Sequence, residues 1–332
     1  MISRRRFAAM LPLGAACFAG SGFFSASAWA QKASRSPLRL VVPFPPGGGG
    51  DVLARFAAEH LSRRLGRKVW IDNRPGAGGT IGAKASSAAK PDGQTLAYVT
   101  NGILCVNPLL YRSANFDAAA SLAPVGQLSS IGLIGVLNPD ALPGVSDLPS
   151  LIAYAKDRPG AVNFASSGSG TTSHLAGLFF AERAGLKLAH VPYKGGAAAI
   201  LDVLAGRIPF MIDVAPNVIG HIASGKLKAL GAASKARLAV APDVPTFEEG
   251  GLSGFELSAW DGIAAPLGTP EAVLDALSEA LADMLAEPDV RAGLARKGAE
   301  PGTGRRADFS AFIAAERPKW ASLVRAVEAS AG

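Results

Sequence analysis

Apolar residues recur along the chain with two different spacings. The short run "LRLVVPF" predicts a buried strand, and the segment Asp51–Leu65 then places Leu53, Phe56 and Leu61 at helical spacing. Gly66 predicts the end of that helix. The strands "KVWID" and "TLAYVT" follow, separated by the Gly-rich "RPGAGGT" and a helix of small residues. Repeated β-α units of this kind predict a mostly parallel sheet with helices on both faces.

A second series of β-α units begins after "APVGQLSSIGLIGVLNP" and contains the strands "VNFASS", "LAHVPY" and "IPFMIDV". Extended crossings near residues 125–138 and 255–266 separate it from the first series, and a helix-rich C-terminus begins at Thr269. We therefore predict an α/β fold of two domains joined by a two-strand hinge, with one large doubly wound domain as the alternative. The predicted boundaries are residues 31–133 and 256–332 for domain 1 and residues 134–255 for domain 2.

The first thirty residues predict an export signal. Three arginines, Arg4 to Arg6, precede an apolar run, and Ala28-Trp29-Ala30 fits the small-x-small pattern of a cleavage site. Cleavage after Ala30 leaves a chain that begins at Gln31 in the periplasm. "SRRRF" favours the twin-arginine route, with the general secretory route as the competitor. A lipoprotein signal at Cys17 is disfavoured because no leucine stands three residues before it.

Charge and composition narrow the class of protein. The signal holds three arginines and no acid, so its removal lowers the net charge from +7 to 7 − 3 = +4. The remaining basic residues are dispersed, which argues against nucleic acid as a partner. After cleavage Cys105 is the single cysteine, so no internal disulfide is expected. A chain that is 49% hydrophobic can instead build a large core.

Glycine-rich segments invite a nucleotide-binding interpretation, but their spacing does not support it. Gly47-x-Gly49 is followed by Val52 at the position where a dinucleotide fingerprint needs glycine. The segment that starts at Gly220 resembles a phosphate-binding loop, but Leu227 stands at the position that requires Ser or Thr. No G-x-S-x-G or H-E-x-x-H motif occurs. The histidines lack metal-ligand spacing; they are His60, His174, His190 and His221. We expect no cofactor, no metal and no catalytic residue.

Two loops instead match an anion-binding site. "FPPGGGGD", from Phe44 to Asp51, follows a strand and precedes a helix, so free N–H groups and the positive end of the helix dipole meet there. "SSGSGTT" repeats this order in the second series, with added hydroxyl donors at Ser167, Thr171 and Thr172. Because strand ends share one edge of a sheet, the loops can form two walls of one cleft. The alternative for the first loop is a tight turn with Asp51 as helix cap.

Three further residues follow strands of the second series. Lys194 in "VPYKGG" can offset the charge of an anion, together with Tyr193, or be an ordinary solvated lysine. Asp213 ends "IPFMID", where it can receive an ammonium or hydroxyl group or cap the next helix. Trp260 on the second crossing is interpreted as packing rather than as a ligand contact.

The chain resembles the Bug-type solute-binding proteins of tripartite tricarboxylate transporters. The resemblance rests on ordered segments across the mature chain, among them "VVPFPPGGGGDVLAR", "IDNRPGAGGTIGA", "SSGSGTTSHLAG", "HVPYKGG", "LDVLAGRIPFMID" and "APDVPTFEEGG". Two segments depart from the usual family pattern. "FDAAASLAPVG" replaces a short acidic-aromatic turn, and "GGGG" is richer in glycine than the commoner loop.

This resemblance implies a periplasmic binding protein clamshell, or Venus flytrap, that holds a small carboxylate between its domains. The implied solute is a di- or tricarboxylate, an amino acid or an aromatic acid, delivered to membrane permease subunits or to a sensor kinase by a monomer. An exported hydrolase on a similar scaffold is the alternative. The implied and inferred ligand-binding residues are Phe44, Pro46, Gly47, Gly48, Gly49, Gly50, Asp51, Ser167, Gly168, Gly170, Thr171, Thr172, Tyr193, Lys194 and Asp213.

Overall fold

The computed structural model describes residues 36–111 and 115–330. The predicted export signal, residues 1–30, lies outside these ranges. The described residues from Pro37 onward belong to one compact unit that contains two β-sheets. Within the described ranges, no helix combines the length and the apolar character that crossing a membrane requires.

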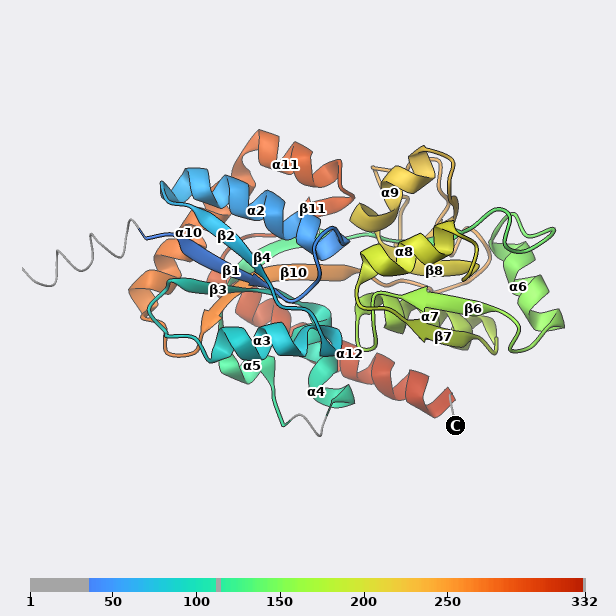
Figure 1. Ribbon diagram of the computed structural model, residues 1–332, viewed down its shortest axis with the longest axis horizontal. Coiled ribbons are helices and arrows are strands. Elements are labelled where there is room, and N and C mark those ends of the chain that lie inside the picture. The colour runs from blue at the N-terminus through green and yellow to red at the C-terminus, as the bar shows by residue number, and fades with distance from the viewer. Residues whose placement is uncertain (1–35, 112–114, 331–332) are drawn as a thin grey trace, which may run out of the picture. The chain divides into compact units, whose positions relative to one another are not determined.

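A six-stranded sheet in the order β11-β4-β10-β3-β1-β2 forms the centre of the first domain (Figure 1). Strand β1 pairs in parallel with β2 and β3. Strand β10 pairs antiparallel with β3 and β4, and β11 pairs antiparallel with β4. The strands are β1 (Leu38–Val42), β2 (Val69–Asn73), β3 (Thr95–Thr100), β4 (Leu122–Ile131), β10 (Ala259–Pro266) and β11 (Ala299–Pro301).

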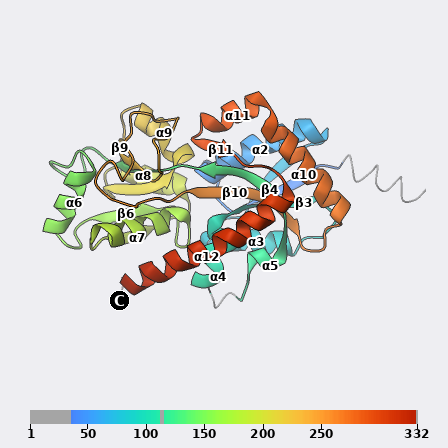
Figure 2. The ribbon, with the colours of Figure 1, turned by 180° about the vertical axis from the view of Figure 1, so that it is seen from behind.

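Helices lie on both faces of this first sheet, with α2, α10 and α11 on one face and α3, α5 and α12 on the other (Figures 1 and 2). The helical segments are α2 (Gly49–Leu65), the 3-10 turn η1 (Ala77–Gly79), α3 (Thr80–Ser87), the π-helical η2 (Gly102–Val106), α4 (Asn107–Leu110), α5 (Ala118–Ser121), α10 (Glu271–Ala286), α11 (Pro288–Ala295) and α12 (Arg306–Ser330). Helix α12 also contacts α7 of the second domain.

A five-stranded sheet in the order β7-β6-β8-β5-β9 forms the second domain. Strand β6 pairs in parallel with β7 and β8, whereas β5 pairs antiparallel with β8 and β9. Helices α8 and α9 lie on one face and α7 on the other (Figure 1). The elements are β5 (Leu133–Leu137), α6 (Leu148–Asp157), β6 (Asn163–Ser166), α7 (Thr172–Ala184), β7 (Ala189–Pro192), α8 (Gly196–Leu204), β8 (Phe210–Val214), α9 (Ala215–Ala223) and β9 (Lys228–Ala232).

The strands of the β-α units pair in parallel as predicted, but both sheets also contain antiparallel pairs and are therefore mixed. Strand β4 ends at Ile131 and β5 begins at Leu133, so the chain passes from one sheet to the other with a single residue between strands. Strand β10 brings the chain back into the first sheet. The crossing strand β10 is antiparallel to β3 in the first sheet, and the crossing strand β5 is antiparallel to β8 in the second. The predicted crossings near 125–138 and 255–266 contain these strands.

Local signals placed several helix ends correctly. Helix α2 ends before Gly66, whose φ of 62° is the left-handed conformation that glycine adopts without strain. Helix α6 begins at a side-chain cap: Asp147 is its N-cap, and the Asp147 carboxylate accepts a hydrogen bond from the Ser150 N–H at 2.9 Å. This carboxylate satisfies one of the free N–H groups at the helix start.

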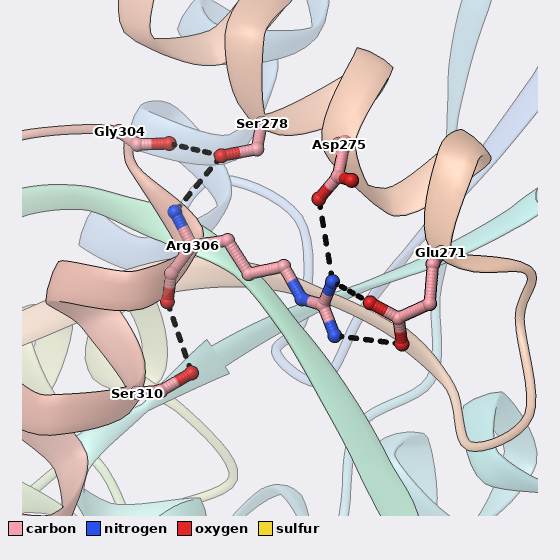
Figure 3. A network of polar contacts seen from close by, with 6 residues as sticks. All are labelled: Glu271, Asp275, Ser278, Gly304, Arg306 and Ser310. Atoms are coloured by element: carbon pink, nitrogen blue, oxygen red, sulfur yellow. Dashed lines mark hydrogen bonds and ion pairs between the residues drawn. The ribbon is translucent and has the colours of Figure 1, made fainter.

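The start of α12 is tied to α10 by the network in Figure 3. The Arg306 guanidinium donates to Glu271 at 3.0 Å and to Asp275 at 3.3 Å. The Ser278 hydroxyl accepts from the Arg306 N–H at 2.8 Å and donates to the Gly304 carbonyl at 3.2 Å. The Ser278 bonds are buried or partly buried and hold the start of α12 against α10, whereas the exposed ion pairs add little stability.

Helix α12 in turn supports the second crossing strand. Trp260 of β10 is 1% exposed and meets the rings of Phe309 and Phe312 edge-on, with centroids 5.8 and 5.3 Å away. Its indole N–H donates to Glu316 at 3.1 Å. These contacts with α12 fix the indole of Trp260, in agreement with its interpretation as a packing residue.

Candidate functional site

A cavity of about 70 Å³ lies between the two domains. It collects residues from the ends of β1, β3, β6 and β8, which is the edge where α/β sheets bind ligands. None of the described residues that line it is Lys, Arg or His. The lining residues are Phe44, Pro45, Gly48, Gly49, Gly50, Gly78, Tyr98, Thr100, Asn101, Ile131, Ser167, Thr171, Thr172, Ser173, Gly196, Asp213, Val214, Ala259 and Trp260.

Three helices begin at this cavity. Gly49 and Gly50 open α2, Thr172 and Ser173 open α7, and Gly196 opens α8. The N-caps of α2 and α8 are glycines without a side-chain cap, so the first N–H groups of these helices are not covered by a capping side chain. Each helix N-terminus carries about half a positive charge. The cavity therefore favours an anion through backbone dipoles rather than through basic side chains.

The four consecutive glycines of the first loop meet different constraints. Gly47 has a φ of 85°, which disfavours other residues. A Cβ on Gly49 would lie 2.6 Å from Val214 Cγ2 of the second domain, and one on Gly50 would lie 2.7 Å from the Phe44 ring. A Cβ on Gly48 would contact nothing closer than 3.7 Å. At Gly49 the close approach is therefore made by the opposite domain.

Asp51 does not line the cavity; its carboxylate holds the glycine loop through the Gly47 N–H. Its carboxylate accepts hydrogen bonds from the Gly47 N–H at 2.9 Å, from Arg55 at 2.8 Å and from the Asn73 amide at 2.8 Å. Burial raises the pKa of Asp51, but these hydrogen bonds outweigh it and hold the pKa below its usual value. The alternative considered from sequence, Asp51 as the helix cap, was wrong, because the N-cap of α2 is Gly48 and Asp51 instead accepts from the Gly47 N–H before the helix.

The hydroxyl groups of the second loop already have acceptors within the protein. Ser167 donates to the Asp213 carboxylate at 3.1 Å, Thr171 to the Gly168 carbonyl at 2.6 Å, and Thr172 to the Asn101 side-chain oxygen at 3.0 Å. A hydroxyl has one proton to donate. These three residues line the cavity, but their hydroxyl protons are donated within the protein, and the Thr172 bond to Asn101 joins the two domains.

Asp213 is the ionisable acid of the cavity wall. It is 2% exposed and accepts from the Asn217 amide at 2.6 Å as well as from Ser167. Burial raises the pKa of Asp213 to about 6, and its hydrogen bonds only partly oppose that rise. An anion in the cavity therefore meets a carboxyl group that gains a proton just below neutral pH.

A second hollow of about 600 Å³ adjoins the cavity and shares Phe44, Ser167 and Thr171 with it. The predicted residues Gly168, Tyr193 and Lys194 line this outer hollow and not the cavity. The Tyr193 hydroxyl donates to Asp202 at 2.6 Å, and Lys194 is exposed. Four predicted site residues line neither hollow: Pro46, Gly47, Asp51 and Gly170.

Beneath the second loop lies a pair of stacked histidines that the sequence did not single out. The rings of His174 and His190 are 4.0 Å apart. His174 Nδ1 accepts from the Gly170 N–H at 3.3 Å, and His190 Nε2 lies 2.6 Å from the Ser166 hydroxyl. Burial lowers the pKa of His174 to about 3 and that of His190 to about 4. Neutral imidazoles thus support the loop.

Sequence reasoning missed more than half of the cavity wall. Tyr98 lies within β3, Asn101 directly follows β3, and Gly78 lies in the turn η1 before α3. The rule that parallel strands end at the ligand-binding edge applies to β3 as much as to β1 and would have found Asn101. Tyr98 and Gly78 carry no comparable signal, because one lies within a strand and the other in a turn whose course depends on the fold.

Known proteins similar to this chain identify its family. The family model described as the tripartite tricarboxylate transporter family receptor matches residues 53–329. The chain belongs to this family. Protein BugT of Bordetella pertussis is 37% identical to it over 290 residues, which cover 87% of this chain and 88% of BugT.

Solved structures of related receptors have the same fold. The periplasmic binding protein BugD is similar with a TM-score of 0.83 and 34% identity, over 88% of this chain and 97% of BugD. An R. palustris protein solved with adipate gives a TM-score of 0.85 at 32% identity, over 88% and 97% of the two chains. MatC from Rhodopseudomonas palustris, solved with bound malate, gives 0.81 at 30% identity, over 87% and 98%. The two-domain binding-protein fold predicted from the resemblance is confirmed.

Proposed function

We propose that this receptor binds one small carboxylate in the cavity between its domains. The observation that carries the proposal is the convergence of the N-termini of α2, α7 and α8 on a cavity that no described basic side chain lines. Backbone N–H groups at helix N-termini stabilise a carboxylate without an ion pair. The adipate and malate in the two related structures are carboxylates of this kind.

The cavity volume favours a short solute. A water molecule needs roughly 10–15 Å³ of such volume, so the 70 Å³ of this cavity holds about five water-sized groups. That is room for one carboxylate and a few carbon atoms. We therefore place the carboxylate of a short acid in the cavity, and any longer chain of the solute extends toward the outer hollow near Lys194.

The proposal includes the route and the role that the sequence predicts. The chain is exported to the periplasm and cut after Ala30, and domain 1 comprises residues 31–133 and 256–332 around domain 2 at residues 134–255. The loaded receptor passes its solute to a membrane permease or reports it to a sensor kinase. N-terminal sequencing of periplasmic protein should begin at Gln31, and a start near Met1 would exclude this processing.

We further propose that the receptor is not an enzyme. The contact between Ser166 and His190 is the arrangement that a hydrolase would need, but Ser166 is 0% exposed and its hydroxyl accepts from the Gly168 N–H at 3.1 Å. Neither Ser166 nor His190 lines the cavity. The Ser166 hydroxyl is enclosed by its own loop, so a solute in the cavity does not contact it.

The test combines identification with titration. Protein purified gently from the periplasm is denatured, and the released solute is identified by mass spectrometry. Calorimetric titration of solute-free protein with succinate, malate, adipate and glutamate should then show one site for at least one acid, with the acid recovered unchanged. Binding of none of these acids, or turnover of a bound one, would contradict the proposal.

A further inference from the structure

The side chain of Asn101 lines the cavity and contacts both domains. Asn101 follows β3 in the first domain and is 0% exposed to solvent. Its side-chain oxygen accepts from the Thr172 hydroxyl of the second domain at 3.0 Å and from the N–H of Trp260 on the second crossing strand at 3.4 Å. One amide therefore touches both domains and the strand that joins them.

These contacts fix which way round the amide lies. A backbone N–H can only donate a hydrogen bond, so the atom that faces Trp260 must be the amide oxygen. The Thr172 hydroxyl then donates to the same oxygen. The NH₂ group is left on the other side, and this Nδ2 has no hydrogen-bond partner among the described residues.

A buried donor without a partner is costly, and native proteins rarely retain one. Asn101 lines the cavity whose walls favour an anion. We propose that the Asn101 NH₂ group donates a hydrogen bond to the carboxylate of the bound solute. This inference rests on the proposed function and assigns Asn101, which neither the sequence motifs nor the comparisons single out, as a solute-binding residue.

The same residue couples solute binding to the approach of the domains. Thr172 can donate to Asn101 only when the start of α7 lies against the end of β3. A Cβ on the neighbouring Gly102 would lie 3.0 Å from the Gly170 carbonyl, so the two segments are in close contact at this point. With Thr172 on its oxygen and the solute on its nitrogen, the Asn101 amide is satisfied only in the closed, loaded receptor.

Asn101→Asp isolates the proposed donor. The new carboxylate keeps an acceptor for Thr172 and Trp260, but it replaces the NH₂ group with an oxygen. Loss of a hydrogen bond to a charged group lowers affinity by about ten- to a hundredfold, and a carboxylate facing a carboxylate lowers it further. Calorimetric titration at pH 7.5 with succinate, malate, adipate and glutamate should show at least a hundredfold weaker binding than in the wild type.

Asn138→Asp is the matched control. Asn138 is 7% exposed, and its NH₂ group donates to the carbonyls of Val203 and Leu204 at 2.9 and 3.0 Å, away from the cavity. The control should lower the melting temperature and leave affinity unchanged. If Asn101→Asp does not fold, the wild type still gives a result: its Asn101 side-chain NH₂ signals in ¹⁵N–¹H spectra should shift on saturation, whereas those of Asn138 should not.

The outcomes separate the two proposals. Wild-type protein that binds none of the four acids overturns the proposed function and this inference together. Wild-type binding with unaltered affinity in folded Asn101→Asp, or with unmoved Asn101 NH₂ signals, overturns only the role of Asn101. Weakened binding in Asn101→Asp together with unchanged binding in Asn138→Asp supports it.

Discussion

Replacing Asp213 with asparagine should stabilise the protein at neutral pH. Asp213 is buried at the end of β8, and burial raises its pKa to about 6 from an ordinary value of 3.8. Above pH 6 the folded protein therefore holds a carboxylate in a site that disfavours its charge. Asparagine has nearly the same shape and does not ionise.

The two pKa values set the size of the effect. One pH unit corresponds to about 1.4 kcal/mol, so the rise from 3.8 to about 6 reduces the free energy of unfolding by about 3 kcal/mol at pH 7.5. The Asp213 carboxylate accepts from Asn217, from Ser167 and from the Val214 N–H, and an asparagine at position 213, with one acceptor oxygen, weakens this set by about 1 kcal/mol. A net gain of about 2 kcal/mol remains for Asp213→Asn.

The sign of the pH dependence follows from the raised pKa. Below pH 3.8 both states of the wild type carry the proton, and its stability is lost as the pH rises from 3.8 through about 6. Urea unfolding between pH 4 and 8 should therefore show the advantage of Asp213→Asn growing with pH. An advantage that is constant with pH, or absent at pH 7.5, would refute the assignment.

Asp51→Asn provides a control of opposite sign. Hydrogen bonds from Arg55, Asn73 and the Gly47 N–H outweigh burial and lower the pKa of Asp51, so its ionised form stabilises the folded state at neutral pH. Asp51→Asn should lower the free energy of unfolding at pH 7.5, and the loss should shrink as the pH falls below the ordinary value of 3.8.

Features governed by neighbouring residues could be predicted from the sequence. The spacing of Leu53, Phe56 and Leu61 and the glycine at position 66 predicted α2 with its correct C-terminal end. The order strand, glycine-rich loop, helix placed Gly48 and Thr171 at the cavity, because a helix that follows a parallel strand begins at the ligand-binding edge. These inferences need only the local chain and one general rule of α/β sheets.

Features decided by distant partners could not be predicted in this way. The direction of β5 relative to β8 depends on the path of the chain between the two domains. The sequence did not show this path, and the antiparallel pairing of β5 with β8 was therefore not predicted. The Thr172 hydroxyl has one proton, and its acceptor, Asn101, is 71 residues away in the chain. Pattern and composition identify a donor, but only the fold shows which acceptor it meets.

Two further predictions concern the histidine beneath the second loop and the glycine at the start of α2. His174→Gln keeps an acceptor for the Gly170 N–H but cannot be protonated, and the pKa of His174 is lowered to about 3. Wild-type stability should therefore be complete above pH 6.5 and fall toward pH 4, and the variant should lose less over that range; parallel losses would contradict this. Gly49→Ala tests why glycine stands at the start of α2. Its Cβ would lie 2.6 Å from Val214 Cγ2, so it should hold the domains apart and weaken solute binding. Val214→Ala removes that methyl group, and the double variant should regain affinity. If it does not, the added Cβ obstructs the solute itself, and the glycine is there for the carboxylate rather than for the opposite domain.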